Sequence, residues 1–336
     1  MLKRFKHINL ICYNKNMDNN LNQIQEIEQL LSKENFSKLQ QDFINISKKY
    51  REENINSGSV VNNDKQALSY VASRMNETSI IVDKVLKTIF QVVDKSEVES
   101  VLDLGSGTGS VLWALENFFS NINITAVERE KCMQKYAKVL CKSLNLNIEY
   151  VLQDVLSKET NNLSNCDLVI ESFMLNEMAE KDSYKALDLM INKANKYILL
   201  VEPGTPKSYQ KMMQIRDCVV AKNLKVLLPC THCKKCPLIN DYCNFTVRLN
   251  RSKFLKNIKG GALGYEDEKY FYLLLSKQDI KNVENMVIRK PIVRKSCIDL
   301  KLCNNGGKVN NITITKKDKE NYSKAKKIKH GDIFNF

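Results

Sequence analysis

One short turn between a strand and a helix constrains the fold of this chain most. The run VESVLDL, from residue 98 to 104, leads into the turn GSGTGS. An apolar helical stretch, VLWALENFF, and a second strand-like run, NITAVE, follow it. This order is a βαβ unit, in which a helix connects two parallel strands. The alternation continues downstream, with strand patterns at 148–153, 167–172 and 197–203 and helical patterns at about 129–144 and 181–195. We therefore expect an α/β fold with an open parallel sheet that binds its ligand at the carboxyl ends of its strands.

The glycine turn also has the properties of a cofactor-binding turn. Glycine permits positive φ angles and lets the backbone come close to a bulky ligand. A dinucleotide-binding turn has its third glycine three residues after the second, whereas this turn has the spacing G-x-G-x-G and follows an aspartate. This tighter form resembles motif I of the S-adenosylmethionine-dependent methyltransferases. The residues that this resemblance assigns to the cofactor are Asp103, Gly105, Gly107 and Gly109.

Two further carboxylates stand where such a cofactor needs them. Glu128 ends the second strand, where it can accept hydrogen bonds from both ribose hydroxyls. Asp154 follows the third strand, where it can hold the adenine amino group. A glycine turn alone can serve packing only, but the turn together with both carboxylates favours a cofactor site. We therefore predict a Rossmann-like methyltransferase core that binds S-adenosylmethionine.

The sequence assigns no catalytic residue. Methyl transfer from a sulfonium is a direct displacement that depends largely on positioning, and a base is needed only for an acceptor whose proton has low acidity. An amino-methylating enzyme would carry an Asn-Pro-Pro-Tyr loop after the fourth strand, where this chain has ESFMLNEM at 171–178. A cytosine-methylating enzyme would carry Pro-Cys there, but Pro229 and Cys230 come later and lie among other cysteines.

A cluster of cysteines is the second constraining feature. Positions 230, 233, 236 and 243 have the spacing C-x2-C-x2-C-x6-C, and Pro237 follows the third. The chain has eleven cysteines and no secretory signal, which indicates a reducing compartment where clustered thiols bind metal. Four thiolates suit zinc or an iron–sulfur cluster, and the spacing alone leaves that choice open. We expect the singly scattered cysteines to be buried small hydrophobes, namely Cys12, Cys132, Cys141, Cys166, Cys218 and Cys297.

Several segments together carry a family resemblance. They are VLDLGSGTGS, VEPGTP at 201–206, PCTHCKKCPL at 229–238, DYCNF at 241–245, GGALGYEDEKYFYLLLS at 260–276 and LKLC at 300–303. From residue 98 to 330 the chain resembles the methyltransferase-like assembly factors of the small ribosomal subunit that occur in mitochondria and in bacteria. The Arg74-Met75 segment is also similar to that family.

The resemblance implies a metal centre and a partner. It implies a four-iron, four-sulfur cluster, with zinc as the alternative, and it gives the ligands as Cys230, Cys236, Cys243 and Cys303. His232 stands beside the first ligand, and Cys233 is an extra thiol that substitutes for Cys303 or stays free. The family also binds small-subunit rRNA and assembly intermediates of the small subunit, and whether it transfers methyl groups is left open.

The charge of the chain fits an RNA partner. Lysine and arginine outnumber aspartate and glutamate by 52 to 38, which gives a net charge of +14. One basic segment is KKDKENYSKAKKIK at 316–329. The other group, which we expect to be the main RNA contact, is Arg248, Arg251, Lys253, Lys256 and Lys259. No stretch approaches the roughly 20 apolar residues of a membrane span. We expect no membrane partner and a monomer away from the ribosome.

These features divide the chain into five parts. They are an N-terminal helical module (1–95), the methyltransferase-like core (96–225), a cysteine-rich metal-binding insertion (226–265), a strand that completes the core sheet (266–280) and a basic C-terminal extension (281–336). In the helical module we expect amphipathic helices at 21–50 and 65–93. The second should turn Arg74 outward and bury Ala72, Met75, Ile80, Val82, Val85 and Ile89.

Three classes of function remain. A cofactor fingerprint joined to an undefined catalytic loop favours a non-catalytic, rRNA-binding assembly factor. The alternative is an active rRNA methyltransferase with a structural zinc or iron–sulfur site. An iron–sulfur electron carrier would need neither the fingerprint nor a basic surface. The first sixteen residues are basic but lack the Arg and Ser enrichment of a mitochondrial presequence, so we expect a bacterial cytoplasmic protein, with the mitochondrial matrix as the alternative.

Overall fold

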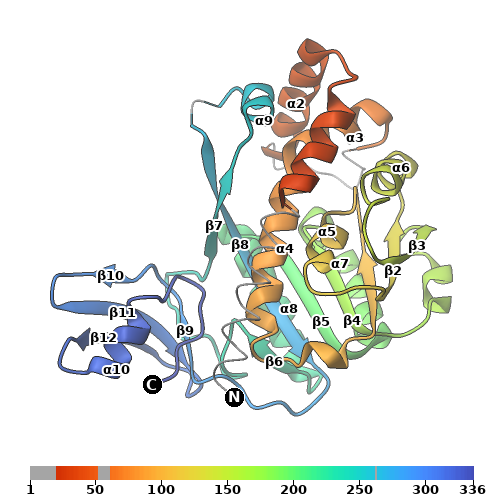
Figure 1. Cartoon of the computed structure of the whole chain (residues 1–336). Helices are drawn as coiled ribbons and strands as arrows, with labels where there is room; N and C mark the ends of the chain where they lie inside the picture. The colour runs from red at the N-terminus through yellow and green to blue at the C-terminus, as the bar shows by residue number, and fades with distance from the viewer. Residues whose placement is uncertain (1–19, 52–60, 262) are drawn as a thin grey trace.

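Five aliphatic, β-branched runs form the parallel half of the main sheet in the computed structural model, which describes residues 20–51, 61–261 and 263–336 (Figure 1). The strands are β1 (Ser100–Leu104), β2 (Asn123–Glu128), β3 (Asn147–Leu152), β4 (Cys166–Ser172) and β5 (Ala194–Pro203). The central residues of β1, β4 and β5 are buried, as expected of strands that are covered on both faces, whereas the edge strand β3 is half-buried or exposed along its length. They pair in parallel in the order β3-β2-β1-β4-β5. This confirms the predicted α/β fold with a parallel sheet.

Three antiparallel strands extend the sheet beyond β5. The apolar strand β8 (Tyr265–Ser276) pairs with β5, which confirms that the run at 269–277 joins the main sheet. The outer half of β8 pairs with β7 (Phe245–Asn250), and its inner half also pairs with β6 (Lys225–Leu228). The cysteine loop connects β6 to β7, so both of its ends are fixed to the main sheet.

Helices connect the parallel strands, as in a doubly wound sheet. After the glycine turn comes α5 (Ser110–Glu116), then α6 (Lys131–Leu140) after β2, α7 (Glu180–Lys193) after β4 and α8 (Pro206–Ala221) after β5. Thr205 caps α8 by accepting the Ser208 N–H, and Pro206 occupies its first turn. Short 3-10 turns complete the connections, at η2 (Lys95–Glu97), η3 (Lys158–Asn162) and η4 (Leu175–Glu177).

Residues 20–31 are helical, and α2 (Phe36–Arg51), α3 (Asp64–Tyr70), a π-helical turn η1 (Val71–Met75) and α4 (Asn76–Ile89) follow. The helices α2 and α3 lie at one end of the core, and α4 runs from there along the core (Figure 1). Ile80 is half-buried, Arg74 keeps 45% of its side chain exposed, and the rest of the predicted inner face is buried: Ala72, Met75, Val82, Val85 and Ile89. The predicted second helix is therefore confirmed, with a π-helical turn inside it.

The hairpin of β7 and β8 projects from the sheet toward these helices (Figure 1). Its tip carries α9 (Lys253–Ile258), which contacts α2. The Phe36 and Phe254 rings meet edge to face with centroids 6.1 Å apart, and the Gln40 amide donates to the Asn257 carbonyl at 3.1 Å. The hairpin therefore joins the sheet to the N-terminal helices.

The last part of the chain forms a small β-sheet module with its own core at one side of the main sheet (Figure 1). It contains β9 (Asn285–Val287), β10 (Ile292–Val293), β11 (Cys297–Asn304), β12 (Val309–Thr315) and α10 (Lys319–Ala325). The strands are antiparallel in the order β10-β11-β12, with β9 also on β11. The core of the module includes Val287, Ile298, Leu300, Leu302, Ile314 and Phe334.

Three further expectations can be compared with the structure. Cys132, Cys141 and Cys166 are buried as predicted, and Cys218 and Cys297 are half-buried. Cys12 and the basic first sixteen residues lie outside the described residues. No helix among the described residues is both long enough and apolar enough to cross a membrane.

Candidate functional site

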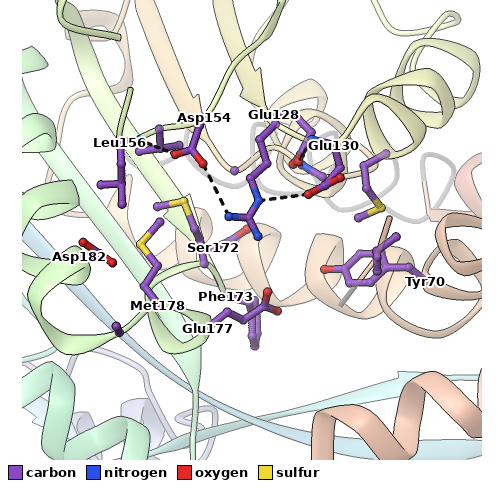
Figure 2. Close-up of a pocket in the computed structure, with 18 residues that line it drawn as sticks. Tyr70, Glu128, Glu130, Asp154, Leu156, Ser172, Phe173, Glu177, Met178 and Asp182 are labelled. Atoms are coloured by element: carbon purple, nitrogen blue, oxygen red, sulfur yellow. Dashed lines mark hydrogen bonds and ion pairs between the residues drawn. The ribbon is translucent and has the colours of Figure 1, made fainter. Parts of the chain in front are cut away.

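A cavity of about 200 Å³ opens at the carboxyl ends of β1, β2, β3 and β4 (Figure 2). The turn after each strand contributes to its wall. Of the residues that the sequence assigned to a cofactor, Gly105, Gly107, Glu128 and Asp154 line the cavity. The rest of its lining includes Val61, Tyr70, Arg129, Glu130, Met133, Val155, Leu156, Ser172, Phe173, Met174, Glu177 and Met178. Asp103 and Gly109 are absent from this lining among the described residues.

The glycines of the turn have different surroundings. Gly107 has φ +55°, and a Cβ built on it would have Met133 Cε, 3.5 Å away, as its nearest side-chain neighbour. Gly109 has φ +91°, and a Cβ there would lie 2.5 Å from Cys141 Sγ on the adjacent element. Gly107 therefore keeps the wall of the cavity open, whereas Gly109 allows close packing at the start of α5.

Glu128 fixes the glycine turn against β2. Its Oε2 accepts the Gly107 N–H and its Oε1 accepts the Glu130 N–H, both at 2.8 Å. Burial raises the pKa of Glu128, and these two N–H groups act in the opposite direction. Because each carboxylate oxygen has two lone pairs, Glu128 retains the capacity to accept further hydrogen bonds from the cavity.

Arg129 lines the cavity and pairs with two of its carboxylates, a role that the sequence pattern did not predict. Its Nε lies 3.3 Å from Glu130 Oε1, and its Nη1 lies 3.7 Å from Asp154 Oδ2 (Figure 2). The other oxygen of Asp154 accepts the Leu156 N–H at 2.7 Å. Asp154 is thus held on the cavity wall by its own loop and by Arg129, and its side chain is 47% exposed.

Asp103 lies beneath the turn, outside the cavity wall. It is fully buried at 0% exposure, and neither carboxyl oxygen has a hydrogen-bond partner among the described residues. Burial raises the pKa of Asp103 to about 8, and the nearby carboxyls of Glu128 and Glu171 add to this rise. Near neutral pH Asp103 is therefore mostly a neutral acid.

The far wall of the cavity comes from unexpected residues. Tyr70, which the sequence analysis treated as part of a packing helix, lies opposite the loop after β4 (Figure 2). In that loop Phe173 has φ +61°, an uncommon conformation for a bulky side chain. Tyr70, Phe173 and Glu177 also line a second cavity of about 460 Å³, bounded further by Arg74, Asn176 and Lys269. The two cavities therefore share one wall.

Two buried carboxyls hold the loop after β4 in place. Glu171 Oε2 accepts the N–H groups of Met174 and Leu175, and Glu202 Oε1 accepts the Asn176 N–H at 2.9 Å. Burial raises the pKa of Glu171 to about 7. Lys211 of α8 donates from Nζ to the carbonyls of Leu175 and Met178. The loop is rigidly supported, but its cavity-facing side chains are Ser172, Phe173, Met174, Glu177 and Met178, which assign no catalytic base.

The structure brings together the four cysteines that the family resemblance selected. Cys230, Cys236 and Cys243 lie on the loop between β6 and β7, and Cys303 lies near the end of β11. Burial raises the pKa of Cys230 to about 11 and of Cys303 to about 12. The charges of Cys230 and Cys236 raise the pKa of Cys303 further. The pKa of Cys243 is raised by burial first, and then by the charges of Cys230, Cys303 and Cys236. The thiols thus lie within electrostatic range of one another.

Neighbouring side chains hold this cysteine centre. The Tyr209 hydroxyl lies 3.3 Å from Cys236 Sγ, and His232 Nε2 lies 3.7 Å from Cys303 Sγ. Cys233 accepts the Val226 N–H of β6 at 3.4 Å. Among the described residues, the only three potential metal ligands whose donor atoms all lie within 4.8 Å of one another are Glu77, Glu266 and Glu268. No three cysteine sulfurs in the described part of the chain come that close to one another.

The two basic groups differ in what they contact. Arg248 makes a bidentate pair with Asp267 at 2.7 Å, and Arg251 and Lys259 pair with Glu266, so three members of the first group are neutralised. The C-terminal segment instead exposes lysines at 316, 317, 319, 324, 326, 327 and 329, of which Lys324 pairs with Glu320. The structure thus favours the C-terminal lysines over the group after the cysteine loop as a free basic surface.

Comparison with known proteins places the chain among ribosome-related proteins. The family model described as "Mitochondrial small ribosomal subunit Rsm22" matches residues 64–335. The human "Ribosome assembly protein METTL17, mitochondrial" is 26% identical over 227 residues, which are 63% of this chain and 49% of that protein. The "Ribosomal RNA small subunit methyltransferase G" of Mycoplasma capricolum is 25% identical over 138 residues, which are 41% of this chain and 55% of that protein. The chain thus spans about half the length of these relatives.

One of the solved structures that match this chain is the magnesium protoporphyrin IX methyltransferase ChlM from Synechocystis PCC 6803 with bound SAM. It covers 73% of this chain and 98% of its own chain at 13% identity, with a TM-score of 0.40. The family match spans the glycine turn and the cysteine loop, and it confirms the resemblance to methyltransferase-like assembly factors of the small subunit. The chain belongs to the mitochondrial small ribosomal subunit Rsm22 family.

Proposed function

We propose that this protein is a small-subunit assembly factor that binds rRNA and whose cysteine centre joins its RNA-binding module to its core. The observation that carries the proposal is the position of Cys303. This residue belongs to β11 of the C-terminal module, whereas the other three thiols belong to the loop of the main sheet. A metal held by all four would therefore crosslink the two parts of the molecule.

Other contacts converge on the same junction. Thr231 Oγ1 donates to the Cys303 carbonyl at 3.4 Å, and Lys234 Nζ donates to the Gly306 carbonyl at 3.1 Å. Arg289 of the module pairs with Asp241 of the loop at 2.6 Å. Because each of these contacts is partly exposed or weak, a metal centre would contribute much of the fixed orientation.

The C-terminal module carries most of the net charge. Residues 281–336 hold fourteen lysines and arginines and five aspartates and glutamates, so this sixth of the chain contributes nine of the fourteen net charges. Lysines of this kind bind phosphates by releasing counterions, which gives salt-sensitive affinity with little sequence preference. We therefore place the rRNA contact on this module.

The residues at the junction fit a four-iron, four-sulfur cluster held by Cys230, Cys236, Cys243 and Cys303. Their thiols are half-buried or buried, and cysteine thiolates are the ligands of such clusters. Bound metal would displace the thiol protons that burial otherwise retains. Zinc is the alternative occupant. Cys233, whose sulfur already accepts the Val226 N–H, is proposed as the free thiol.

The cofactor cavity fits S-adenosylmethionine. Gly107 lets the backbone approach the ligand, Glu128 would accept the ribose hydroxyls, and Asp154 would hold the adenine amino group. Gly105 also lines the cavity, whereas Asp103 and Gly109 lie outside its lining, where Gly109 allows close packing against Cys141. When bound, the cofactor would supply a methyl group on a sulfonium. An active rRNA methyltransferase remains the second candidate because the larger cavity shares Tyr70, Phe173 and Glu177 with this pocket.

The proposed location in the cell comes from the relatives and replaces the expectation of a bacterial cytoplasmic protein. Both the matching family and the human relative carry the word mitochondrial in their descriptions. The expectation of a bacterial cytoplasmic protein has no support from these relatives. We therefore propose the mitochondrial matrix, where the small ribosomal subunit of that organelle would be the partner, and a monomer away from it.

The Cys236→Ser variant tests the proposal. We expect it to lose bound metal and to bind the small subunit more weakly, because the module is no longer fixed to the core. The measurements are metal per chain and co-sedimentation with small subunits. Cys233→Ser is the matched control and should keep both properties. Unchanged metal content and unchanged co-sedimentation of Cys236→Ser would contradict the proposal.

A further inference from the structure

Arg216 is a buried cation beneath the cysteine loop. It lies on α8, and only 1% of its side chain is exposed. Arginine is almost never fully buried unless it is paired. Its carboxylate partner, Asp217, lies 3.1 Å away but is 71% exposed, so solvent screens that pair. The charge of Arg216 therefore needs a further anionic partner.

The guanidinium points into the tight turn of the cysteine loop. Its Nη2 donates to the carbonyls of His232 at 2.8 Å and Lys234 at 2.7 Å. Both carbonyls belong to the segment between Cys230 and Cys236. The guanidinium also interacts with the Cys230 side chain, while its Nε is buried without an acceptor among the described residues. Arg216 thus holds the loop backbone and still has a donor to offer.

We propose that Arg216 is the positioning residue of the cysteine centre, which fixes the loop by two carbonyls and offsets the negative charge of the metal-bound thiolates. This inference rests on the metal centre proposed above. Four thiolates bring more negative charge than a zinc ion or an oxidised four-iron cluster neutralises, so a buried cation beside them stabilises the bound state. Nη2 donates to both carbonyls while Nη1 donates to Asp217, and a lysine ammonium on a flexible stem reproduces this set of contacts less well than the planar guanidinium.

The test is the rate at which purified, metal-loaded protein loses its metal to a chelator. We expect Arg216→Gln to lose metal about 10 to 100 times faster than the wild type, the range found when partners of metal ligands are removed. Arg216→Lys keeps the charge but not the fork, so its rate should lie between the two. Lys207→Gln removes an exposed charge from the same helix and should match the wild type.

A second readout applies if the metal is an iron–sulfur cluster. Loss of the buried cation should shift the reduction potential of the cluster to more negative values, because reduction adds negative charge to the centre. Wild-type rates and potentials in Arg216→Gln would overturn the inference while leaving the metal centre standing. If Arg216→Gln does not fold, Arg216→Lys decides, and a wild-type rate there overturns the inference. Absence of metal from the wild type would overturn both proposals.

Discussion

Asp103 gives the folded chain a carboxyl that prefers its neutral form. Its pKa is raised from 3.8 to about 8, mainly by burial. A group whose pKa is higher in the folded state stabilises the fold most below its unfolded pKa and loses that contribution as pH rises through the folded pKa. The contribution of Asp103 to the free energy of unfolding should therefore fall between about pH 4 and pH 8.

The Asp103→Asn variant tests this account. The amide has nearly the same shape but carries no charge. At pH 8.5 the variant should therefore be more stable than the wild type by about 1 to 3 kcal/mol, because the wild type then buries an ionised carboxylate without a partner. Urea unfolding at pH 6 and pH 8.5 measures the difference. A variant whose stability changes with pH as steeply as that of the wild type would rule out Asp103 as the source.

The sequence predicted site residues better where a motif defines them than where packing does. Gly105, Gly107, Glu128 and Asp154 were found because each follows a strand at a characteristic position, and all four line the cavity. Tyr70, Arg129 and Phe173 were missed. Their positions depend on how a distant helix and two loops pack, and no local pattern records that. The assignment of Gly105, Gly107, Glu128 and Asp154 to S-adenosylmethionine stays a prediction.

At the scale of elements, α8 links the two candidate sites. Tyr209 and Arg216 face the cysteine centre, and Lys211 holds the loop that forms one wall of the cofactor cavity. The Lys211 ammonium donates to the carbonyls of Leu175 and Met178 at the two ends of the 3-10 turn η4 in that loop. The position of the helix therefore determines the shape of the cavity.

The Lys211→Met variant should weaken binding of S-adenosylmethionine about tenfold. Methionine preserves much of the apolar stem but removes hydrogen bonds from a charged donor, each worth about 1.5 to 3 kcal/mol. Calorimetric titration with S-adenosylmethionine gives the affinity, and the exposed Lys207→Met on the same helix is the control. Equal affinities in the two variants would show that Lys211 does not shape the cavity.

The elements found from the sequence were those with long apolar runs. The patterns for β1 to β5 and β8 predicted strands because aliphatic, β-branched and aromatic residues dominate at least one stretch of each. β6 and β7 were not predicted, because β6 has four residues and β7 alternates apolar residues with Thr246, Arg248 and Asn250 beside a dense cysteine and lysine segment. Tertiary pairing with β8 makes these two segments strands.

At the scale of the whole molecule, we expect rRNA to bind the lysines of the C-terminal module. Replacing Lys316, Lys317 and Lys319 by glutamine should lower the affinity for small-subunit rRNA. It should also reduce the slope of log affinity against log salt by about 0.7 to 0.9 for each lost phosphate contact. Filter binding at several salt concentrations measures both. A matched variant with glutamine at Lys131, Lys142 and Lys158, exposed on the core, should keep the wild-type slope. The same loss in both variants would argue for diffuse attraction by net charge.

The sequence alone could not place the fourth cysteine. The spacing along the sequence places Cys233 in one group with Cys230, Cys236 and Cys243. Cys303 lies sixty residues beyond Cys243, and it reaches the centre only because β11 ends beside the cysteine loop. The family resemblance supplied that residue. The division of the chain into modules likewise remains a proposal, with the cysteine centre at the boundary between core and C-terminal extension.

The most direct test of the central claim is the iron, sulfide and zinc content of protein purified without oxygen, with its visible absorption spectrum. The account predicts about four irons and about four sulfides per chain, with a broad visible band from a cysteine-ligated cluster. Stoichiometric zinc without colour would contradict the iron–sulfur assignment. It would leave a metal that joins the core to the basic module.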